Sequence, residues 1–222
     1  MDKEKIAFFD FCETLVDFQT ADAFVHFVRQ NHGTQKMYRR HKIYTLLKKS
    51  YILLVIDRIL HCSANKKVIL WQLKGQSLSD LETFAEEYYY LKLVNHKIDA
   101  VVDKMKALQS DGYRTVLVSG GYDIYLKVFA KNNKVNTSDI ISTKIGFKNG
   151  RCTGRIEGID CMGKNKIKLI ERMFNKQDIL SVSLSDSKSD LPLLLWTNDC
   201  YVVSHKKKQK WAVDNKLKEI IW

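Results

Sequence analysis

From Arg114 onward the chain alternates short apolar runs with helical stretches, and this alternation restricts the fold more than any other feature of the sequence. The apolar runs cover residues 115–118, 140–142, 180–184 and 201–203. Strands that alternate with helices favour a parallel sheet, because each connection crosses over through a helix. The pattern therefore predicts an α/β fold, with a Rossmann-like parallel sheet and helices on both faces.

Two further stretches extend the predicted sheet. Residues 6–9 form an apolar run near the N-terminus that is short enough for a buried strand. Residues 144–147 and 151–153 flank Lys148-Asn149-Gly150, a turn sequence that favours a β-hairpin. We therefore expect one strand before the helical part of the chain and a hairpin within the sheet.

Residues 17–105 have helical patterns throughout. Thr20 or Asp22 is predicted to cap the first helix, and Gly33 to end it. Two further helices are predicted over residues 35–61 and 66–73. Another helix is expected after a capping box at residues 77–80, and the last helix covers residues 95–110. A chain of 222 residues is long enough for a core with an inserted subdomain. We therefore expect residues 1–16 and 106–222 to form the α/β core, and residues 17–105 to form an inserted all-helical cap.

Residues able to do chemistry stand at the ends of the predicted strands. Asp10 follows the first strand and Ser119-Gly120-Gly121 the second, residues 161–166 open a helix, and residues 185–190 follow a third strand. Open parallel sheets bind ligands at the carboxyl ends of their strands, so these groups are expected to converge. An aspartate in that place can attack phosphorus or hold Mg²⁺. A hydroxyl with glycine amides suits a phosphate group.

The composition argues against several classes of protein. Five cysteines are scattered along the chain and never spaced Cys-x-x-Cys, which argues against a disulfide framework or a zinc site and favours reduced, cytoplasmic thiols. No signal peptide precedes the first strand. The most lipid-like stretch, residues 51–56, is far shorter than the roughly 20 apolar residues that span a bilayer. We therefore expect a soluble protein located in the cytoplasm.

The formal net charge is +12, and much of the positive charge lies in two clusters. A basic surface attracts phosphorylated metabolites, nucleic acid or acidic lipid headgroups, although a solvated basic face is the plainest explanation. The sequence has no basic stripe interleaved with aromatic residues and no nucleic-acid motif, so no nucleic-acid partner is expected. The clusters comprise Lys36, Arg39, Arg40, His41, Lys42, Lys48 and Lys49, and Lys206, Lys207, Lys208 and Lys210.

Taken in order, these motifs resemble the haloacid dehalogenase-like (HAD) superfamily of phosphotransferases. Residues 149–155 and 185–194 resemble stretches typical of its phosphoserine phosphatase-like branch, the subfamily IB hydrolases. The resemblance covers nearly the whole chain. It implies a Mg²⁺-dependent phosphomonoester phosphatase or phosphotransferase that acts on a small phosphorylated metabolite.

The resemblance also implies roles for individual residues. Asp10 corresponds to the nucleophile that forms an aspartyl-phosphate, and its carboxylate also ligates Mg²⁺. The residue at the position of Cys12 gives the metal a backbone carbonyl. Asp186 is expected to ligate Mg²⁺ directly, and Asp190 to act through water or to orient Lys166.

The phosphate group is expected to meet a second set of residues. Ser119 and the amides of Gly120 and Gly121 would bind its oxygens at the start of a helix, where glycine allows close approach. Lys166 matches the family spacing Cys-x-Gly-x-x-Lys and would neutralise charge during transfer, with Lys164 as the second choice.

Cys12 departs from the family pattern, because the phosphatases have an aspartate there that serves as acid and base. A thiol does this poorly near neutral pH, so we expect slow hydrolysis. One alternative is a catalytically weak relative that binds a phosphorylated ligand. Another is a phosphatase for a phosphorylated lipid headgroup, suggested by the basic, partly apolar cap, with peripheral membrane contact. No acid and base that would hold phosphoserine are recognisable in the cap sequence.

Overall fold

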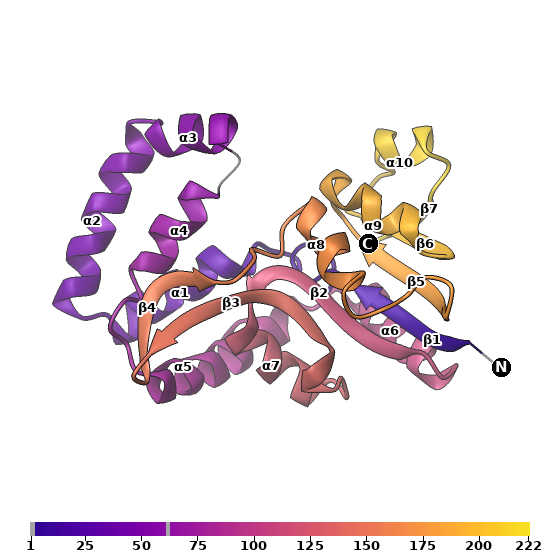
Figure 1. Ribbon diagram of the computed structural model, residues 1–222, viewed down its shortest axis with the longest axis horizontal. Coiled ribbons are helices and arrows are strands. Elements are labelled where there is room, and N and C mark those ends of the chain that lie inside the picture. The colour runs from indigo at the N-terminus through magenta and orange to yellow at the C-terminus, as the bar shows by residue number, and fades with distance from the viewer. Residues whose placement is uncertain (1–2, 61–62) are drawn as a thin grey trace.

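A seven-stranded sheet forms the centre of the computed structural model, which describes residues 3–60 and 63–222 (Figure 1). The strand order is β4-β3-β2-β1-β5-β6-β7, and every neighbouring pair is parallel except β3 and β4. The predicted α/β fold with a parallel sheet is confirmed. The strands are β1 (Glu4–Phe9), β2 (Arg114–Tyr122), β3 (Ile140–Lys148), β4 (Arg151–Glu157), β5 (Ile179–Ser185), β6 (Asp199–Ser204) and β7 (Lys218–Ile221).

The antiparallel pair β3–β4 is the predicted hairpin. Asn149 and Gly150 at its turn have φ values of 50° and 70°. Two consecutive positive φ angles are what a two-residue type I′ turn requires, and Asn-Gly adopts them at low cost. This turn places β4 at one edge of the sheet, where it also contacts the helix α4 (Ala64–Trp71).

Helices cover both faces of the sheet, as predicted. Alternate residues of β1 point to opposite sides, since the side-chain period of a strand is two. Ile6 and Phe8 pack in one apolar cluster with Ile170 and Leu193, whereas Ala7 and Phe9 pack in the other. The helices are α1 (Thr20–His32), α2 (Gln35–Lys49), α3 (Ile52–Leu60), α4 (Ala64–Trp71), α5 (Leu78–Leu91), α6 (Asp99–Ser110), α7 (Asp123–Asn132), α8 (Lys164–Ile170), α9 (Leu191–Trp196) and α10 (Lys210–Asp214).

The helices α2, α3 and α4 lie at the end of the molecule opposite α9 and α10 in Figure 1, and α4 packs against β4. The helical pattern over residues 35–61 is two helices rather than one, because the chain turns at Ser50 and Tyr51. Tyr51 has a φ of 59°, which an α-helix does not allow. His61, at the end of that predicted stretch, lies outside the described residues.

The start of α1 also differs from the prediction. Its N-cap is Gln19, and neither Thr20 nor Asp22 occupies that position. The Thr20 hydroxyl is 3.0 Å from Cys12 Sγ and 2.7 Å from the Tyr125 hydroxyl. Thr20 is fully buried, so its polar group is used to join the loop after β1 to α7.

Two findings bear on the cellular setting. Cys12, Cys152, Cys161 and Cys200 are free thiols, while Cys62 lies outside the described residues. Within residues 3–60 and 63–222, no helix combines the length and the apolar character needed to cross a membrane.

Candidate active site

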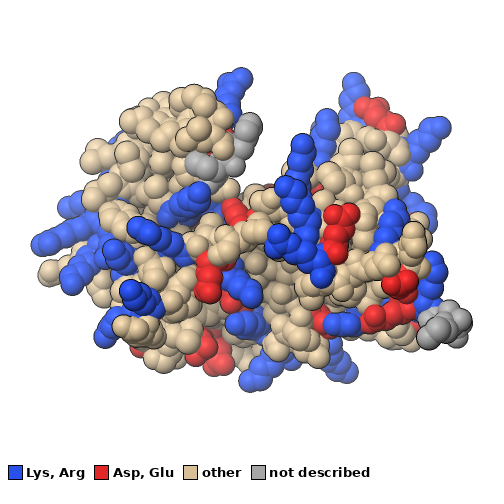
Figure 2. Space-filling view, in the orientation of Figure 1, with Lys and Arg blue, Asp and Glu red and all other residues tan. Residues whose placement is uncertain are grey.

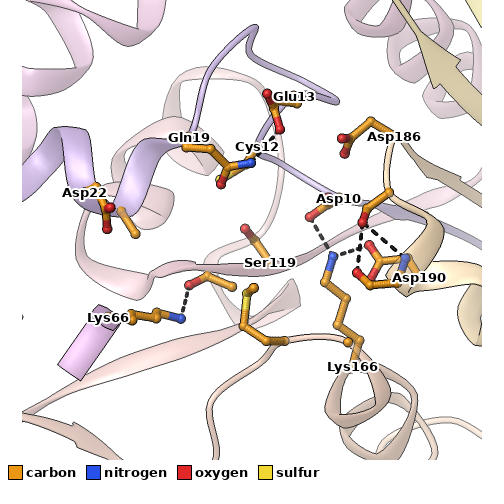
Figure 3. Close-up of a pocket in the computed structure, with 16 residues that line it drawn as sticks. Asp10, Cys12, Glu13, Gln19, Asp22, Lys66, Ser119, Lys166, Asp186 and Asp190 are labelled. Atoms are coloured by element: carbon orange, nitrogen blue, oxygen red, sulfur yellow. Dashed lines mark hydrogen bonds and ion pairs between the residues drawn. The ribbon is translucent and has the colours of Figure 1, made fainter. Parts of the chain in front are cut away.

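A cavity of about 260 Å³ lies at the carboxyl ends of β1, β2 and β5 (Figure 3). Its walls also include residues from α1 and α4 and from the loops that precede α8 and α9. The structure thus brings together residues that the sequence places far apart. The predicted site residues that line the cavity are Asp10, Cys12, Ser119, Gly120, Lys166, Asp186 and Asp190.

Lys166 is the central charged group of this cavity. Its Nζ is 2.8 Å from Asp10 Oδ1 and 2.5 Å from Asp190 Oδ2, and its side chain is only 5% exposed. A buried ammonium group requires such partners, because burial without them costs several kcal/mol. Lys164 is exposed and does not line the cavity, which favours Lys166 over the second choice.

Asp190 is held as firmly as the lysine that it contacts. Its Oδ2 also accepts a hydrogen bond from the Ser185 hydroxyl at 2.7 Å, while its Oδ1 is buried and has no partner among the described residues. Burial alone would lower the pKa of Lys166, but the charges of Asp10 and Asp190 outweigh burial and raise it above the ordinary value. Lys166 therefore remains charged, and Asp190 fixes its direction toward Asp10.

The carboxylates carry more negative charge than Lys166 balances. Burial raises the pKa of Asp10, although Lys166 partly offsets the effect. Burial and then the charge of Asp10 raise the pKa of Asp186 to about 7. Two carboxylates with raised pKa values beside each other mark a place that favours an added cation.

Thr14 positions Asp186, a role that was not predicted from the sequence. Its fully buried hydroxyl donates to Asp186 Oδ1 at 3.1 Å and accepts from the Asp186 amide at 3.0 Å. This pair joins the loop after β1 to the loop after β5. A hydroxyl four residues after Asp10 was the only sequence signal available for this contact.

The donor set fits Mg²⁺ better than a metal that needs a complete protein cage. Among the residues that the structure describes, no three His, Cys, Asp or Glu side chains form a metal-binding cluster. Mg²⁺ uses one or two carboxylates and keeps water or phosphate oxygens as its other ligands. Asp10 and Asp186 offer these two carboxylates, and the buried free oxygen of Asp190 offers an acceptor for a bound water.

The phosphate-binding end of the cavity differs in part from expectation. β2 continues through Tyr122 and α7 begins at Asp123, so residues 119–121 end a strand rather than start a helix. Ser119 and Gly120 line the cavity but Gly121 does not, and the Gly121 amide donates to Ser119 Oγ at 2.9 Å. This hydrogen bond uses the amide that was expected to meet phosphate.

Close packing favours glycine at both of these positions. A Cβ atom on Gly120 would lie 2.2 Å from the Met162 sulfur, and one on Gly121 would lie 2.4 Å from the Tyr125 hydroxyl. Either side chain would force its neighbour to move. Glycine here allows Met162 and α7 to approach the end of β2, and so shapes the cavity.

Cys12 lies at the edge of a buried hydrogen-bonded chain. Its Sγ is 3.0 Å from Thr20 Oγ1, which in turn is 2.7 Å from the hydroxyl of Tyr125. Burial, and next the charge of Asp10, raise the pKa of the Cys12 thiol to about 11. The thiol is therefore protonated near neutral pH and cannot serve as a base.

Lys66 is the residue that sequence reasoning missed most completely. It reaches from α4 into the cavity, where its Nζ donates to Gly120 O at 2.5 Å (Figure 3). The same Nζ donates to Thr143 Oγ1 at 2.9 Å and pairs with Asp160. In so basic a chain, nothing in the sequence distinguishes this lysine from its neighbours. Glu13, Gln19 and Asp22 also line the cavity, and Gln19 donates to Glu13 at 2.6 Å.

Comparisons with known proteins identify the family and the fold. Residues 7–195 match the profile of the haloacid dehalogenase-like hydrolase family. A protein of unknown function from Bordetella pertussis Tohama I superposes with a TM-score of 0.81 at 19% identity, over 99% of both chains. A phosphoserine phosphatase in its apo form superposes with a TM-score of 0.62 at 18% identity, over 99% of this chain and 94% of the other. A search of curated proteins found no significant match.

The structural neighbours include a phospho-aspartyl intermediate analogue of phosphoserine phosphatase. It has a TM-score of 0.57 and 20% identity, over 99% of this chain and 94% of the other. At such low identity these likenesses show a shared fold.

Proposed function

Because the chain belongs to the haloacid dehalogenase-like hydrolase family, we propose that it is a Mg²⁺-dependent phosphomonoester phosphatase or phosphotransferase with Asp10 as nucleophile. Its substrate is a small phosphorylated metabolite. The observation that carries the proposal is the buried Lys166, held between Asp10 and Asp190 in a cavity that Ser119 also lines. A cation beside a carboxylate suits the attack of that carboxylate on an anionic phosphoryl group.

The reaction proceeds in two displacements. An Asp10 carboxylate oxygen bonds to phosphorus while the bond from phosphorus to the ester oxygen breaks, and the departing alkoxide takes a proton to leave as the alcohol. Water, or another acceptor hydroxyl, then attacks the aspartyl-phosphate, which restores Asp10 and releases phosphate or the transferred product. Lys166 and the Ser119 hydroxyl hold the phosphoryl oxygens in both steps.

Asp10, Asp186 and the backbone carbonyl of Cys12 would hold Mg²⁺, which when bound offsets the negative charge of the phosphoryl oxygens and of the carboxylates. Thr14 keeps the Asp186 carboxylate directed at this place through its two hydrogen bonds. The free Oδ1 of Asp190 would accept from a metal-bound water while Oδ2 remains on Lys166.

We further propose that residues 17–105 act as the cap over this centre, with residues 1–16 and 106–222 as the core. The cavity supports this division, because α1 and α4 supply one wall and the sheet supplies the floor. Asp22 and Lys66 then meet the substrate beyond its phosphate. The free thiols are consistent with a reducing compartment, and we propose the cytoplasm.

Cys12 favours a second candidate function. Since its thiol is protonated near neutral pH and cannot act as a base, the chain would bind a phosphorylated ligand, or keep the aspartyl-phosphate, for longer than a fast phosphatase does. The first step needs no base, so both candidates predict an aspartyl-phosphate if the ligand is a phosphomonoester. They differ in how quickly that intermediate is hydrolysed.

Turnover and trapping together test the proposal. We expect p-nitrophenyl phosphate to be hydrolysed with Mg²⁺ and not after chelation. We also expect acid quenching followed by peptide mass spectrometry to find phosphate on the peptide that contains Asp10. An Asp10→Asn variant, which keeps the size of the side chain, should give no phosphopeptide. A trapped phosphopeptide without turnover would instead favour the second candidate, and the absence of both would contradict Asp10 as nucleophile.

A further inference from the structure

The helix α3 has an apolar surface that the described part of the chain leaves uncovered. Of its nine residues only Leu53 is buried, while the side chains of Leu54 and Ile59 are 65% and 70% exposed. Exposed apolar residues that lie singly are ordinary, but a continuous group of them marks a surface for interaction. We call this group the α3 tip, formed by Leu46, Tyr51, Ile52, Leu54, Val55, Ile59 and Leu60.

The charged groups beside the α3 tip are positive. Asp57 is the acidic residue of α3, and its carboxylate turns back to accept hydrogen bonds from the amides of Ala64 and Asn65 at the start of α4. This carboxylate is thus directed toward α4, and the exposed cations beside the tip outnumber it. Lys48, Lys49 and Arg58 are exposed around the tip, so its apolar surface has a cationic border.

A second basic segment lies on the same side of the molecule. Lys206, Lys207, Lys208 and Lys210 are exposed in the loop before α10 and at its start. In Figure 1, α3 and α10 stand at the tops of two lobes that project in the same direction. Figure 2 shows mainly uncharged residues at the top of the α3 lobe, Lys and Arg along its flank and on the α10 lobe, and a hollow between the lobes.

The hollow leads to the catalytic cavity. Lys66 of α4 lines this cavity from the side of the α3 lobe, and Met162, Gly163 and Ser189 line it from the side of α8 and α9. The apolar tip, the cavity mouth and the α10 lysines thus share one face of the molecule. A partner that contacts the two lobes together would also face the cavity.

Charge decides between the occupants that could cover such a face. A second copy of the chain would bring two proteins of net charge +12 together, with Lys and Arg around both tips. An anionic bilayer instead offers negative headgroups to the lysines and an apolar layer to Leu54 and Ile59. The length of α3, nine residues, suits a helix that lies in the interface, since spanning requires about 20.

We propose that the α3 tip docks on the surface of a membrane that contains anionic lipids. The apolar side chains enter the region between headgroups and acyl chains, while Lys48, Lys49 and Arg58 contact the headgroups. The α10 lysines add a second electrostatic contact across the cavity mouth. This docking is a property of the surface and holds whether or not the phosphatase proposal is correct.

Sedimentation with lipid vesicles tests the proposal directly. Wild-type protein should bind vesicles of phosphatidylcholine and phosphatidylserine, bind pure phosphatidylcholine weakly, and be released as salt rises. Leu54→Glu should weaken binding to the anionic vesicles by at least about tenfold, since it puts a like charge where apolar burial is needed. Leu91→Glu is the matched control, because Leu91 is 62% exposed at the end of α5 and away from the tip.

A second pair of variants tests the basic contact. Replacing Lys206 and Lys207 by Gln should weaken binding to anionic vesicles by about thirtyfold, which corresponds to about 1 kcal/mol for each lysine near such a surface. Replacing Lys131 and Lys134, exposed in and after α7, should leave binding unchanged. The circular dichroism spectrum of each variant establishes that it is folded.

Three results would overturn the proposal. The first is wild-type protein that stays in solution with anionic vesicles at low salt. The second is equal binding by Leu54→Glu and Leu91→Glu. The third is a wild-type dimer that Leu54→Glu converts to monomer in sedimentation velocity, without vesicle binding by either protein, which would identify a second copy as the occupant.

Discussion

The floor of the cavity and the helical wall above it use charge in different ways. On the floor, Asp10, Lys166 and Asp190 are almost fully buried and bonded to one another, so their positions are fixed by the sheet. In the wall, Asp22 is exposed, and Lys66 is held by a single carboxylate from the core, Asp160. We infer that the residues of the floor carry out the phosphoryl reaction. The wall is placed to contact the rest of the substrate, and the α3 tip is placed to contact a membrane.

Asp10→Asn should have the largest effect, and it should affect only the function of the floor. Removing the nucleophile should lower turnover of a phosphomonoester by about 10³-fold or more, since residues that act as a catalytic unit cannot replace one another. Vesicle binding through the α3 tip should be unchanged. Residual turnover within about tenfold of the wild type would show that another group attacks phosphorus.

Lys166→Met tests whether the floor depends on its buried charges for stability. The substitution leaves Asp10 and Asp190 buried without a cation, so the free energy of unfolding should fall by about 3–5 kcal/mol at pH 7. Lys164→Met, two residues away and exposed, is the control and should change stability by less than about 0.5 kcal/mol. Urea unfolding with a chelator present measures both.

The same variant has a definite dependence on pH. Burial already raises the pKa of Asp10 in the folded state, and loss of Lys166 removes the cation that opposes this rise. The folded variant therefore binds more protons than the unfolded chain, so its stability should rise as pH falls from 7 toward 5. A destabilisation that stays constant over this range would mean that the carboxylates find another partner.

The floor could be predicted from sequence because it consists of short motifs at strand ends. An apolar run ending in Asp10, and the runs before Ser119 and Asp186, determine both the parallel strands and where their polar groups meet. Asn149-Gly150 fixed the hairpin for an equally local reason. Strand β7 was not predicted, since Lys218–Ile221 is short and contains two charged residues.

The wall could not be predicted in the same way. The contact of Lys66 with Asp160 joins residues far apart in the chain, and no local pattern marks either of them. Thr20 looked like a helix cap, but its hydroxyl is used by Cys12 and Tyr125 in a tertiary contact. The break at Tyr51 follows from a positive φ at a residue that does not favour it, which the helical pattern of residues 35–61 concealed.

A change of one residue at the border of floor and wall should raise activity. Cys12→Asp supplies a group that can protonate the leaving oxygen and then activate water, whereas the thiol, with a pKa of about 11, does neither well. We expect turnover of a generic phosphomonoester to increase at least about tenfold. Steady-state rates and the level of trapped aspartyl-phosphate, measured side by side, should change in opposite directions.

Cys12→Ser is the matched control for the previous variant. It keeps a small hydrogen-bonding group within reach of Thr20 but supplies no carboxylate, so its turnover should remain near that of the wild type. If wild-type protein is as fast as Cys12→Asp, then Cys12 is no handicap and the proton is moved by another group.

The smallest expected effect belongs to the wall. Lys66 forms an ion pair with Asp160 and also supplies a positive charge to the cavity. Lys66→Met should therefore raise KM for an anionic substrate about fivefold, corresponding to roughly 1 kcal/mol of binding free energy. The value of kcat should change less, because Lys66 touches neither Asp10 nor Lys166 in the structure. Lys67→Met, the next and exposed position of α4, should change neither constant.

Kinetics and stability together separate the two roles of Lys66. If Lys66 only joins α4 to the core through its ion pair, its removal should lower the free energy of unfolding. KM should then be unchanged, because no charge that contacts the substrate is lost. If it meets the substrate, the increase in KM should shrink as salt rises, since screening weakens the attraction in the wild type but not in the variant. An unchanged KM at low salt would mean that Lys66 does not bind the substrate. Substrate binding would then depend on the residues of the floor, and the proposed role of the wall in substrate selection would be wrong.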